Sequence, residues 1–237
     1  MSLSPSTYTE VGTTRLVELG HRYTQDSTGR SWRYAKAGAS NLGRGKLTVA
    51  ATVDAQRINL SMPVAPVAGA KSIKVTIGTG NAAENDYRDG WFVVQDGAGE
   101  GRSYPIEGHS AITASAAGFF KLGEPVDTLG VITEANVDLI KNFYDGVVIS
   151  VTDQADLVAG VPNVAVTAAY YHWEQTWGPC SVWFDEAVAN GTALTIGTGT
   201  AGQVEAVDGA GEPLVGYVAG TAGVDTEYQL VDLQIRY

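Results

Sequence analysis

Short runs that alternate apolar and polar residues, separated by glycine-rich turns, recur along most of the chain. The run KSIKVTIG at 71–78 shows the pattern clearly, because Ile73, Val75 and Ile77 fall on one side of an extended strand. The 29 glycines suit turns and disfavour helices, in which each glycine costs about 1 kcal/mol relative to alanine. We therefore predict an all-β fold built from short-strand modules.

The spacing of these runs predicts three parts. Residues 1–30 form an N-terminal arm, extended over 1–15, together with a first strand. Residues 31–130 form a middle β module. Residues 131–237 form a C-terminal module, in which short strands and glycine-rich turns predict a small β-barrel or sandwich.

At most one short helix is expected. The strongest candidate is ITEANVDLIKNFY at 132–144, where Thr133 is suited to cap the helix. Val137, Ile140 and Tyr144 would then fall on one side of it. The segment is short, so the sequence leaves the choice between a helix and another conformation open.

Charge and cysteine content narrow the classes of function. The chain carries 15 Lys and Arg against 26 Asp and Glu, a net charge of −11, which disfavours binding to nucleic acid and to anionic membranes. We find neither a signal peptide nor a run of the roughly 18 to 20 apolar residues that a membrane helix needs. The single cysteine cannot form an intrachain disulfide, which fits assembly in a reducing cytoplasm.

The segment YYHWEQTWGPCSVWFDE at 170–186 concentrates the chain's aromatic residues. A strand over 169–177 would place Tyr171, Trp173 and Trp177 on one side, before Gly178-Pro179 interrupts the pairing. Such a face suits a core, a subunit contact or, ranked last, stacking on a sugar. The candidate interface residues are Tyr171, Trp173, Trp177, Trp183 and Tyr8.

The same segment holds groups that are common in catalysis. His172 and Glu174 would point to one side of the strand and form an ion pair. Cys180 lacks the flanking cation or helix N-terminus that lowers the pKa of a reactive thiol. We expect Cys180 to be a small buried residue and no catalytic residue to be present; a cysteine hydrolase that uses Cys180 and His172 is the alternative.

Two further patterns carry weak signals for ligands. The string GTGTAG at 197–202 is superficially similar to a dinucleotide-binding loop but has no strand–helix–strand context. Asp153 and Asp156 are a calcium-binding alternative that ranks below a solvated loop. We therefore expect no cofactor and no metal.

Three groups of segments follow one another along the chain. They are SWRYAKAGASNLGRGKL at 31–47, then DGWFVVQDGAGEGRSYPIEGHS at 89–110 with FFKLGEPVDTL at 119–129, then 170–186 with TALTIGTGTAGQVEAV at 192–207 and EPLVGYVAG at 212–220. This succession resembles the N-terminal hairpin, the middle β module and the C-terminal β-barrel of tailed-bacteriophage capsid decoration (cement) proteins.

The resemblance implies a non-enzymatic virion structural protein, made in the host cytoplasm, that binds the outer surface of a phage capsid and bridges its subunits. It implies the major capsid protein and further copies of the chain, as a homotrimer, as partners. The N-terminal arm would reach onto a neighbouring subunit. The alternative is another virion component, such as a head-fibre base, tail-tube or receptor-binding protein, that contacts glycan through the Trp-rich strand. Neither hypothesis involves nucleic acid or a membrane.

Overall fold

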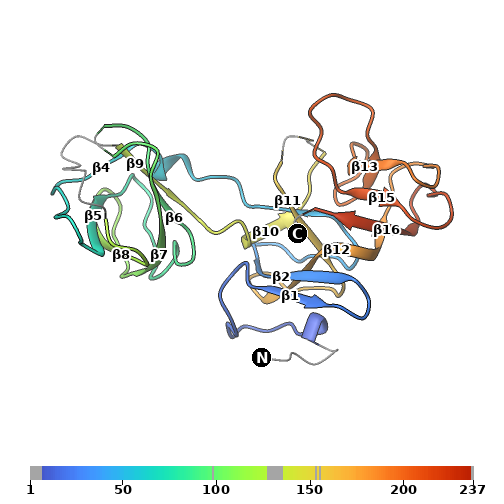
Figure 1. Cartoon of the computed structure of the whole chain (residues 1–237), viewed down its shortest axis with the longest axis horizontal. Coiled ribbons are helices and arrows are strands. Elements are labelled where there is room, and N and C mark those ends of the chain that lie inside the picture. Colours follow the sequence, from blue (N-terminus) through green and yellow to red (C-terminus); the bar gives the residue numbers. More distant parts are fainter. Residues whose placement is uncertain (1–6, 98, 127–135, 153, 155, 236–237) are drawn as a thin grey trace. The chain divides into compact units, whose positions relative to one another are not determined.

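The computed structural model describes residues 7–97, 99–126, 136–152, 154 and 156–235, and these residues form β-strands almost throughout (Figure 1). Helical structure in this part of the chain is limited to two single-turn 3-10 helices, so the predicted all-β fold is confirmed. The elements in chain order are η1 (Thr7–Thr9), β1 (Arg22–Gln25), β2 (Arg30–Ala37), β3 (Thr48–Val49), η2 (Ala55–Arg57), β4 (Leu60–Ser61), β5 (Ser72–Thr76), β6 (Trp91–Val94), β7 (Ser103–His109), β8 (Ala117–Leu122), β9 (Asn136–Ile140), β10 (Asp145–Ile149), β11 (Val158–Pro162), β12 (Tyr171–Trp183), β13 (Ala193–Ile196), β14 (Val204–Ala206), β15 (Gly216–Val218) and β16 (Tyr228–Gln234).

The strands group into two compact units, each described by itself below. The split unit comprises residues 1–51 and 143–237, and the inserted unit comprises residues 52–142. The predicted boundaries fell after residue 30 and after residue 130, the second of which lies outside the described residues. The division differs from the prediction because β2 and β3 pair with strands from the second half of the chain.

The inserted unit is a six-stranded antiparallel sheet in the order β4-β9-β6-β7-β8-β5 that curls into a nearly closed barrel. Its end strands, β4 and β5, approach each other. Ile73, Val75 and Ile77 are buried, as their alternation predicted. They belong to one apolar core, whose other members include Leu60, Tyr87, Phe92, Val94, Tyr104, Ile106, Phe120, Leu122, Val137 and Leu139.

The predicted helix at 132–144 is wrong over its described part. Asn136–Ile140 form β9, which pairs with β4 on one side and with β6 on the other. Val137 and Leu139 are buried in the barrel, whereas Asp138 between them is only partly buried. A two-residue period is satisfied here because both neighbouring strands supply backbone hydrogen bonds. The expected cap, Thr133, lies outside the described residues.

The split unit is a ten-stranded sheet that closes on itself in part. Because β2 pairs with β12 as well as with β10, the strands β2, β10, β3, β11 and β12 form a ring. Figure 1 shows β2 beside β12, and β16, β15, β13 and β14 extend the sheet beyond β12. The barrel-like C-terminal module that we predicted is thus completed by N-terminal strands.

The chain leaves and re-enters the split unit at adjacent points. In the antiparallel ladder between β3 and β10, Val49 lies opposite Val148. The Cβ atom of Ala51 lies 3.5 Å from the position that a Cβ atom on Gly146 would take. Residues 52–142 are therefore an insertion between two neighbouring strand ends.

We expect the split unit to fold without the inserted unit. A chain in which a short glycine–serine turn replaces residues 52–142 should keep a β-type circular dichroism spectrum and one cooperative unfolding transition. Closing a short turn between adjacent strand ends costs little chain entropy. The isolated fragment 52–142 is the matched control and should also fold, since it holds its own core. A shortened chain that unfolds without cooperativity would contradict the prediction.

Candidate functional site

Much of the predicted aromatic face of β12 is buried inside the split unit. Trp173 is 1% exposed and packs in a cluster with Trp32 and Tyr34 of β2. Tyr34 lies opposite Trp173 in the ladder, and their ring centroids are 5.0 Å apart. Tyr171, which is partly buried, stacks on Tyr34 at 5.8 Å. For Trp173, the choice between core and subunit contact is therefore decided in favour of the core.

The N-terminal segment packs against this aromatic cluster. The ring of Tyr8 stacks on that of Trp32 with centroids 5.2 Å apart, and the Arg30 guanidinium lies over both rings, at 5.3 and 5.0 Å. Gly12 exchanges two backbone hydrogen bonds with Tyr171, of 3.1 and 2.8 Å. We expected residues 1–15 to be an extended arm, but residues 7–12 are held by their own unit. Residues 1–6 lie outside the described part of the chain.

A bulge separates the two halves of β12. The ladder with β2 shifts register between Gln175 and Trp177, so Trp177, which is half-buried, does not continue an unbroken alternation from Trp173. The buried amide of Gln175 donates to the carbonyl oxygens of Trp177 and Gly178. Gly178 has a φ of +77°, and a Cβ atom there would lie 2.5 Å from the carbonyl oxygen of Gly29. Glycine is therefore required at the bulge.

His172 and Glu174 form a buried pair. The His172 Nε2 lies 2.7 Å from Glu174 Oε1, and both side chains are fully buried, which confirms the predicted contact. Ala35 of β2 lies opposite His172 and shares its face of the sheet. Gly160 of β11 leaves room for the pair, because a Cβ atom there would lie 2.7 Å from Glu174 Cβ. A fully buried pair meets no ligand from solvent, so we assign it a structural role.

Cys180 is buried, as predicted, in the apolar core that β12 shares with β16. Its side chain is 3% exposed, and burial raises the pKa of the thiol to about 12. Eight residues separate Cys180 from His172 along β12, which at about 3.3 Å per residue places them on the order of 25 Å apart. A nucleophile and its base need a contact of about 3 Å. Cys180 and His172 therefore do not form the nucleophile–base pair that the cysteine hydrolase alternative requires.

The weak ligand patterns also gain no support. The glycine string at 197–202 joins β13 to β14, which pair antiparallel, whereas a dinucleotide loop joins a strand to a helix. The Thr198 backbone N–H and hydroxyl donate to the Glu205 carboxylate at 2.9 and 2.8 Å. Among the described residues, no three His, Cys, Asp or Glu side chains gather as a metal site. Asp153, from the calcium alternative, lies outside them.

The solvent-facing side of β12, β16 and β15 carries an apolar surface that sequence reasoning missed. Tyr228 and Leu230 of β16 are each 48% exposed, and Tyr217 of β15 is also exposed. In the ladder with β12, Trp183 lies opposite Tyr228 and Ser181 lies opposite Leu230. Val182, between Ser181 and Trp183, belongs to the buried core, as do Val231 and Leu233 further along β16. We call Trp183, Ser181, Tyr228, Leu230 and Tyr217 the outer face.

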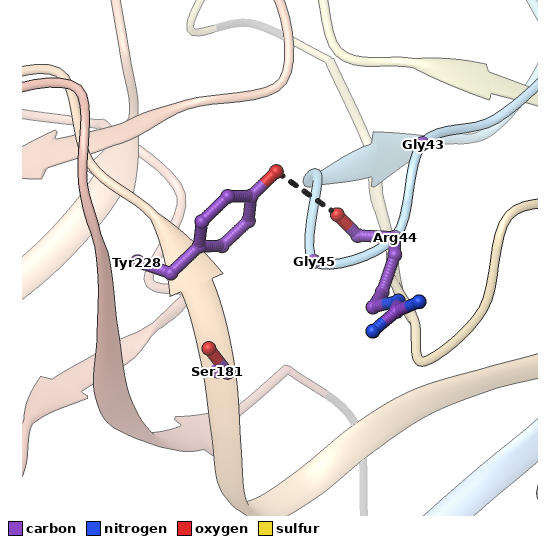
Figure 2. A pocket seen from close by; sticks show the side chains of 5 residues that line it. All are labelled: Gly43, Arg44, Gly45, Ser181 and Tyr228. Carbon is purple, nitrogen blue, oxygen red and sulfur yellow. Dashed lines mark hydrogen bonds between the residues drawn. The ribbon is translucent and has the colours of Figure 1, made fainter.

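A pocket of about 400 Å³ opens at one end of the outer face (Figure 2). Its lining comprises Gly43, Arg44, Gly45, Ser181 and Tyr228. Figure 2 shows the Tyr228 hydroxyl donating to the Arg44 carbonyl oxygen, at 3.2 Å. Gly45 has a φ of +68°, and a Cβ atom there would lie 2.7 Å from Tyr228 Cε1. The loop approaches the Tyr228 ring this closely because Gly45 has no side chain.

Trp183 lies next to Tyr228, one of the residues that line this pocket. Its ring centroid lies 6.4 Å from that of Tyr228 with the planes 25° apart, and its Nε1 donates to the Thr226 carbonyl oxygen at 3.0 Å. The Lys46 Nζ lies 4.3 Å from the centre of the Trp183 ring. Trp183 is thus one predicted interface residue whose ring lies beside both an exposed tyrosine and a cation.

The sequence held a signal for this surface. The strand YQLVDLQ carries apolar residues on both of its alternating sides. Val231 and Leu233 are buried in the core, while Tyr228 and Leu230 remain exposed. Apolar residues on both faces of a strand indicate a second contact surface. Arg44 carries no comparable signal, because its place depends on loop geometry.

Comparison of the chain with protein-family models, curated proteins and solved structures found no match. Function therefore has to be argued from the geometry. The described part of the chain also contains no helix long and apolar enough to cross a membrane. The rare reactive groups support the fold, whereas the outer face exposes aromatic rings and the adjoining pocket exposes the Ser181 hydroxyl and the Arg44 guanidinium.

Removing the buried tryptophan should cost far more stability than removing the surface one. We expect Trp173→Ala to lower the free energy of unfolding by about 3–5 kcal/mol, because it leaves a cavity in the aromatic cluster. Trp183→Ala is the matched control and should cost about 1 kcal/mol. Chemical denaturation followed by circular dichroism measures both, and equal losses would contradict the assignment of Trp173 to the core.

The Cys180 thiol should be inert while the chain is folded. With a pKa of about 12, about one thiol in ten thousand is ionised at pH 8, and the thiolate is the reactive form. Ellman's reagent should therefore label the folded protein slowly and the unfolded protein fully. Rapid labelling of the folded protein would contradict both the burial and the raised pKa.

Proposed function

We propose that this chain is a non-enzymatic virion structural protein that binds the outer surface of a phage capsid and stabilises it by bridging capsid subunits. The observation that carries the proposal is that both units keep large apolar side chains exposed on their strands. Trp91 and Phe119 are exposed in the inserted unit, and Tyr228 and Leu230 in the split unit. In the split unit, Tyr228 and Leu230 adjoin Trp183 in one ladder as a contiguous surface, and contiguous exposed apolar surfaces are typical of protein interaction sites.

The identity of the partners rests on the resemblance of the successive segments to capsid decoration proteins. The proposed partners are the major capsid protein and further copies of the chain, as a homotrimer on the virion surface. Two units with separate exposed surfaces suit a bridging role, because linked contacts of modest affinity strengthen each other. The net charge of −11 favours solubility before assembly.

A receptor-binding, tail-tube or head-fibre role is the second candidate. The exposed rings of the outer face favour it, since aromatic rings stack on sugars. Trp173 is buried and cannot serve in such a contact, so glycan binding would have to use Trp183 and Tyr228. Location and copy number in the particle separate the two roles.

Particles of the phage that encodes this chain provide the test. We expect many copies over the head by electron cryomicroscopy. Particles that lack the protein should release their DNA at a lower temperature than complete particles, because subunit bridges oppose the outward pressure of packed DNA. Adding the purified protein should restore heat resistance. A few copies confined to the tail, or unchanged heat resistance without the protein, would contradict the proposal.

A further inference from the structure

We propose that the pocket beside Tyr228 binds a carboxylate side chain, an Asp or Glu of a partner protein, whose chain lies across the outer face. This inference goes beyond the proposed function, because it assigns a ligand chemistry that does not require the partner to be a capsid subunit. It rests on charge, on unused hydrogen-bonding groups and on the apolar surface beside the pocket.

The charge at the pocket is positive in an otherwise acidic chain. Arg44 is the charged residue of the lining; it is exposed, and its guanidinium has no partner among the described residues. Lys46 adds a second cation above the neighbouring Trp183 ring. Asp225 and Glu227 are exposed on the turn before Tyr228 and do not line the pocket. The pocket therefore complements a negative charge.

The polar groups at the pocket suit a carboxylate. The guanidinium of Arg44 can donate two parallel hydrogen bonds to one carboxylate. The exposed Ser181 hydroxyl, also without a partner among the described residues, borders the same pocket and can donate a third (Figure 2). The volume of about 400 Å³ lies at the small end of ligand pockets. It suits a side chain better than a large cofactor.

The pocket is held in place before any ligand arrives. The Gly45 N–H donates to the Pro162 carbonyl oxygen at 2.9 Å, and the Gly45 carbonyl oxygen accepts from the Trp183 N–H at 3.0 Å. The Tyr228 hydroxyl fixes the Arg44 carbonyl in turn. A loop with three such anchors loses little freedom on binding, which lowers the entropic cost of association.

The surface next to the pocket favours a protein over a sugar. Leu230 and Tyr217 continue the exposed strip away from Tyr228, and an aliphatic side chain such as Leu230 offers no stacking plane for a sugar ring. Tyr, Trp and Arg are the residues enriched in protein interfaces. Asp232 lies opposite Tyr217, about 13 Å along β16 from Tyr228. The acidic residue of the partner therefore lies at the Arg44 end and its apolar neighbours toward Leu230.

The test uses the full-length protein and displayed random dodecapeptides as the probe. We expect the selected peptides to share an Asp or Glu next to an apolar residue. Replacing that residue by Asn or Gln in the synthetic peptide should weaken binding about tenfold or more, as measured by fluorescence anisotropy, because a charge-assisted hydrogen bond is lost. Added salt should weaken binding as well.

Variants of the protein locate the contact. Arg44→Glu and Tyr228→Ala should each weaken binding about tenfold or more, whereas Arg88→Glu should leave it unchanged. Arg88 is an exposed arginine of the inserted unit, so this control makes the same change in net charge. Arg44 is exposed at a loop tip, so Arg44→Glu tests the proposal even if Tyr228→Ala does not fold.

Three results would overturn the inference: no selected peptide carries an acidic residue, the selected peptides bind Arg44→Glu as tightly as the original protein, or nothing is selected. A glycan array is the second arm. Binding of acidic glycans that Arg44→Glu abolishes, without peptide binding, would assign the pocket to sugars instead. These measurements use the isolated protein, so their failure is distinguishable from failure of the capsid proposal, which is tested on particles.

Discussion

The pairing of β12 with β2 is the contact on which the split unit depends. The first half of the 13-residue strand β12 lies between β2 and β11, and its second half pairs with β16. Without the ladder between β2 and β12, the ring would be an open sheet. The N-terminal segment would also lose the Tyr171 backbone and the Trp32 ring on which it packs. One strand thus joins the beginning, the middle and the end of the chain.

Local sequence pattern identified strands but not their partners. The alternation of Ile73, Val75 and Ile77 with polar residues predicted a strand, and β5 lies in this segment. The pattern is readable because residues on one buried face of a strand recur at every second position. Asn136–Ile140 misled the prediction, since apolar residues at 137 and 140 also fit a helical turn. The segment is a strand because it pairs with β4 on one side and with β6 on the other. Both partners are distant in sequence, so a local sequence pattern does not reveal them. The domain boundaries shifted for the same reason, because the pairing of β2 with β10 and β12 joins segments far apart in sequence.

The candidate site was predictable only in part, and two tryptophans in the two halves of β12 show why. Trp173 and Trp183 belong to one strand, and the sequence made both of them interface candidates. Tyr8, from the N-terminal segment, packs against the cluster around Trp173, whereas Trp183 stacks on Tyr228 at an exposed surface. What covers a strand face depends on tertiary contacts. The burial of Cys180 was predictable, because its immediate neighbours already indicated a strand without an activating charge.

The buried pair of His172 and Glu174 helps to fix the register between β2 and β12. A slip of one residue between β2 and β12 would turn Tyr34 toward this pair and place Ala35 beside Trp173. A ring would not fit where even a Cβ atom on Gly160 meets Glu174, and an alanine would leave a cavity beside Trp173. Separating His172 from Glu174 would leave buried polar groups without their hydrogen-bond partner, which costs about 1–3 kcal/mol or more.

The large residues on one side of β12 and the polar pair on the other therefore allow a single register with β2. The ladder of β12 with β16 begins at Trp177, directly after the register shift between Gln175 and Trp177. Ser181 and Trp183 lie beside Leu230 and Tyr228 as a consequence. The outer face inherits its geometry from the interior, so His172 and Glu174, which the sequence placed among groups common in catalysis, act by fixing the register of β12.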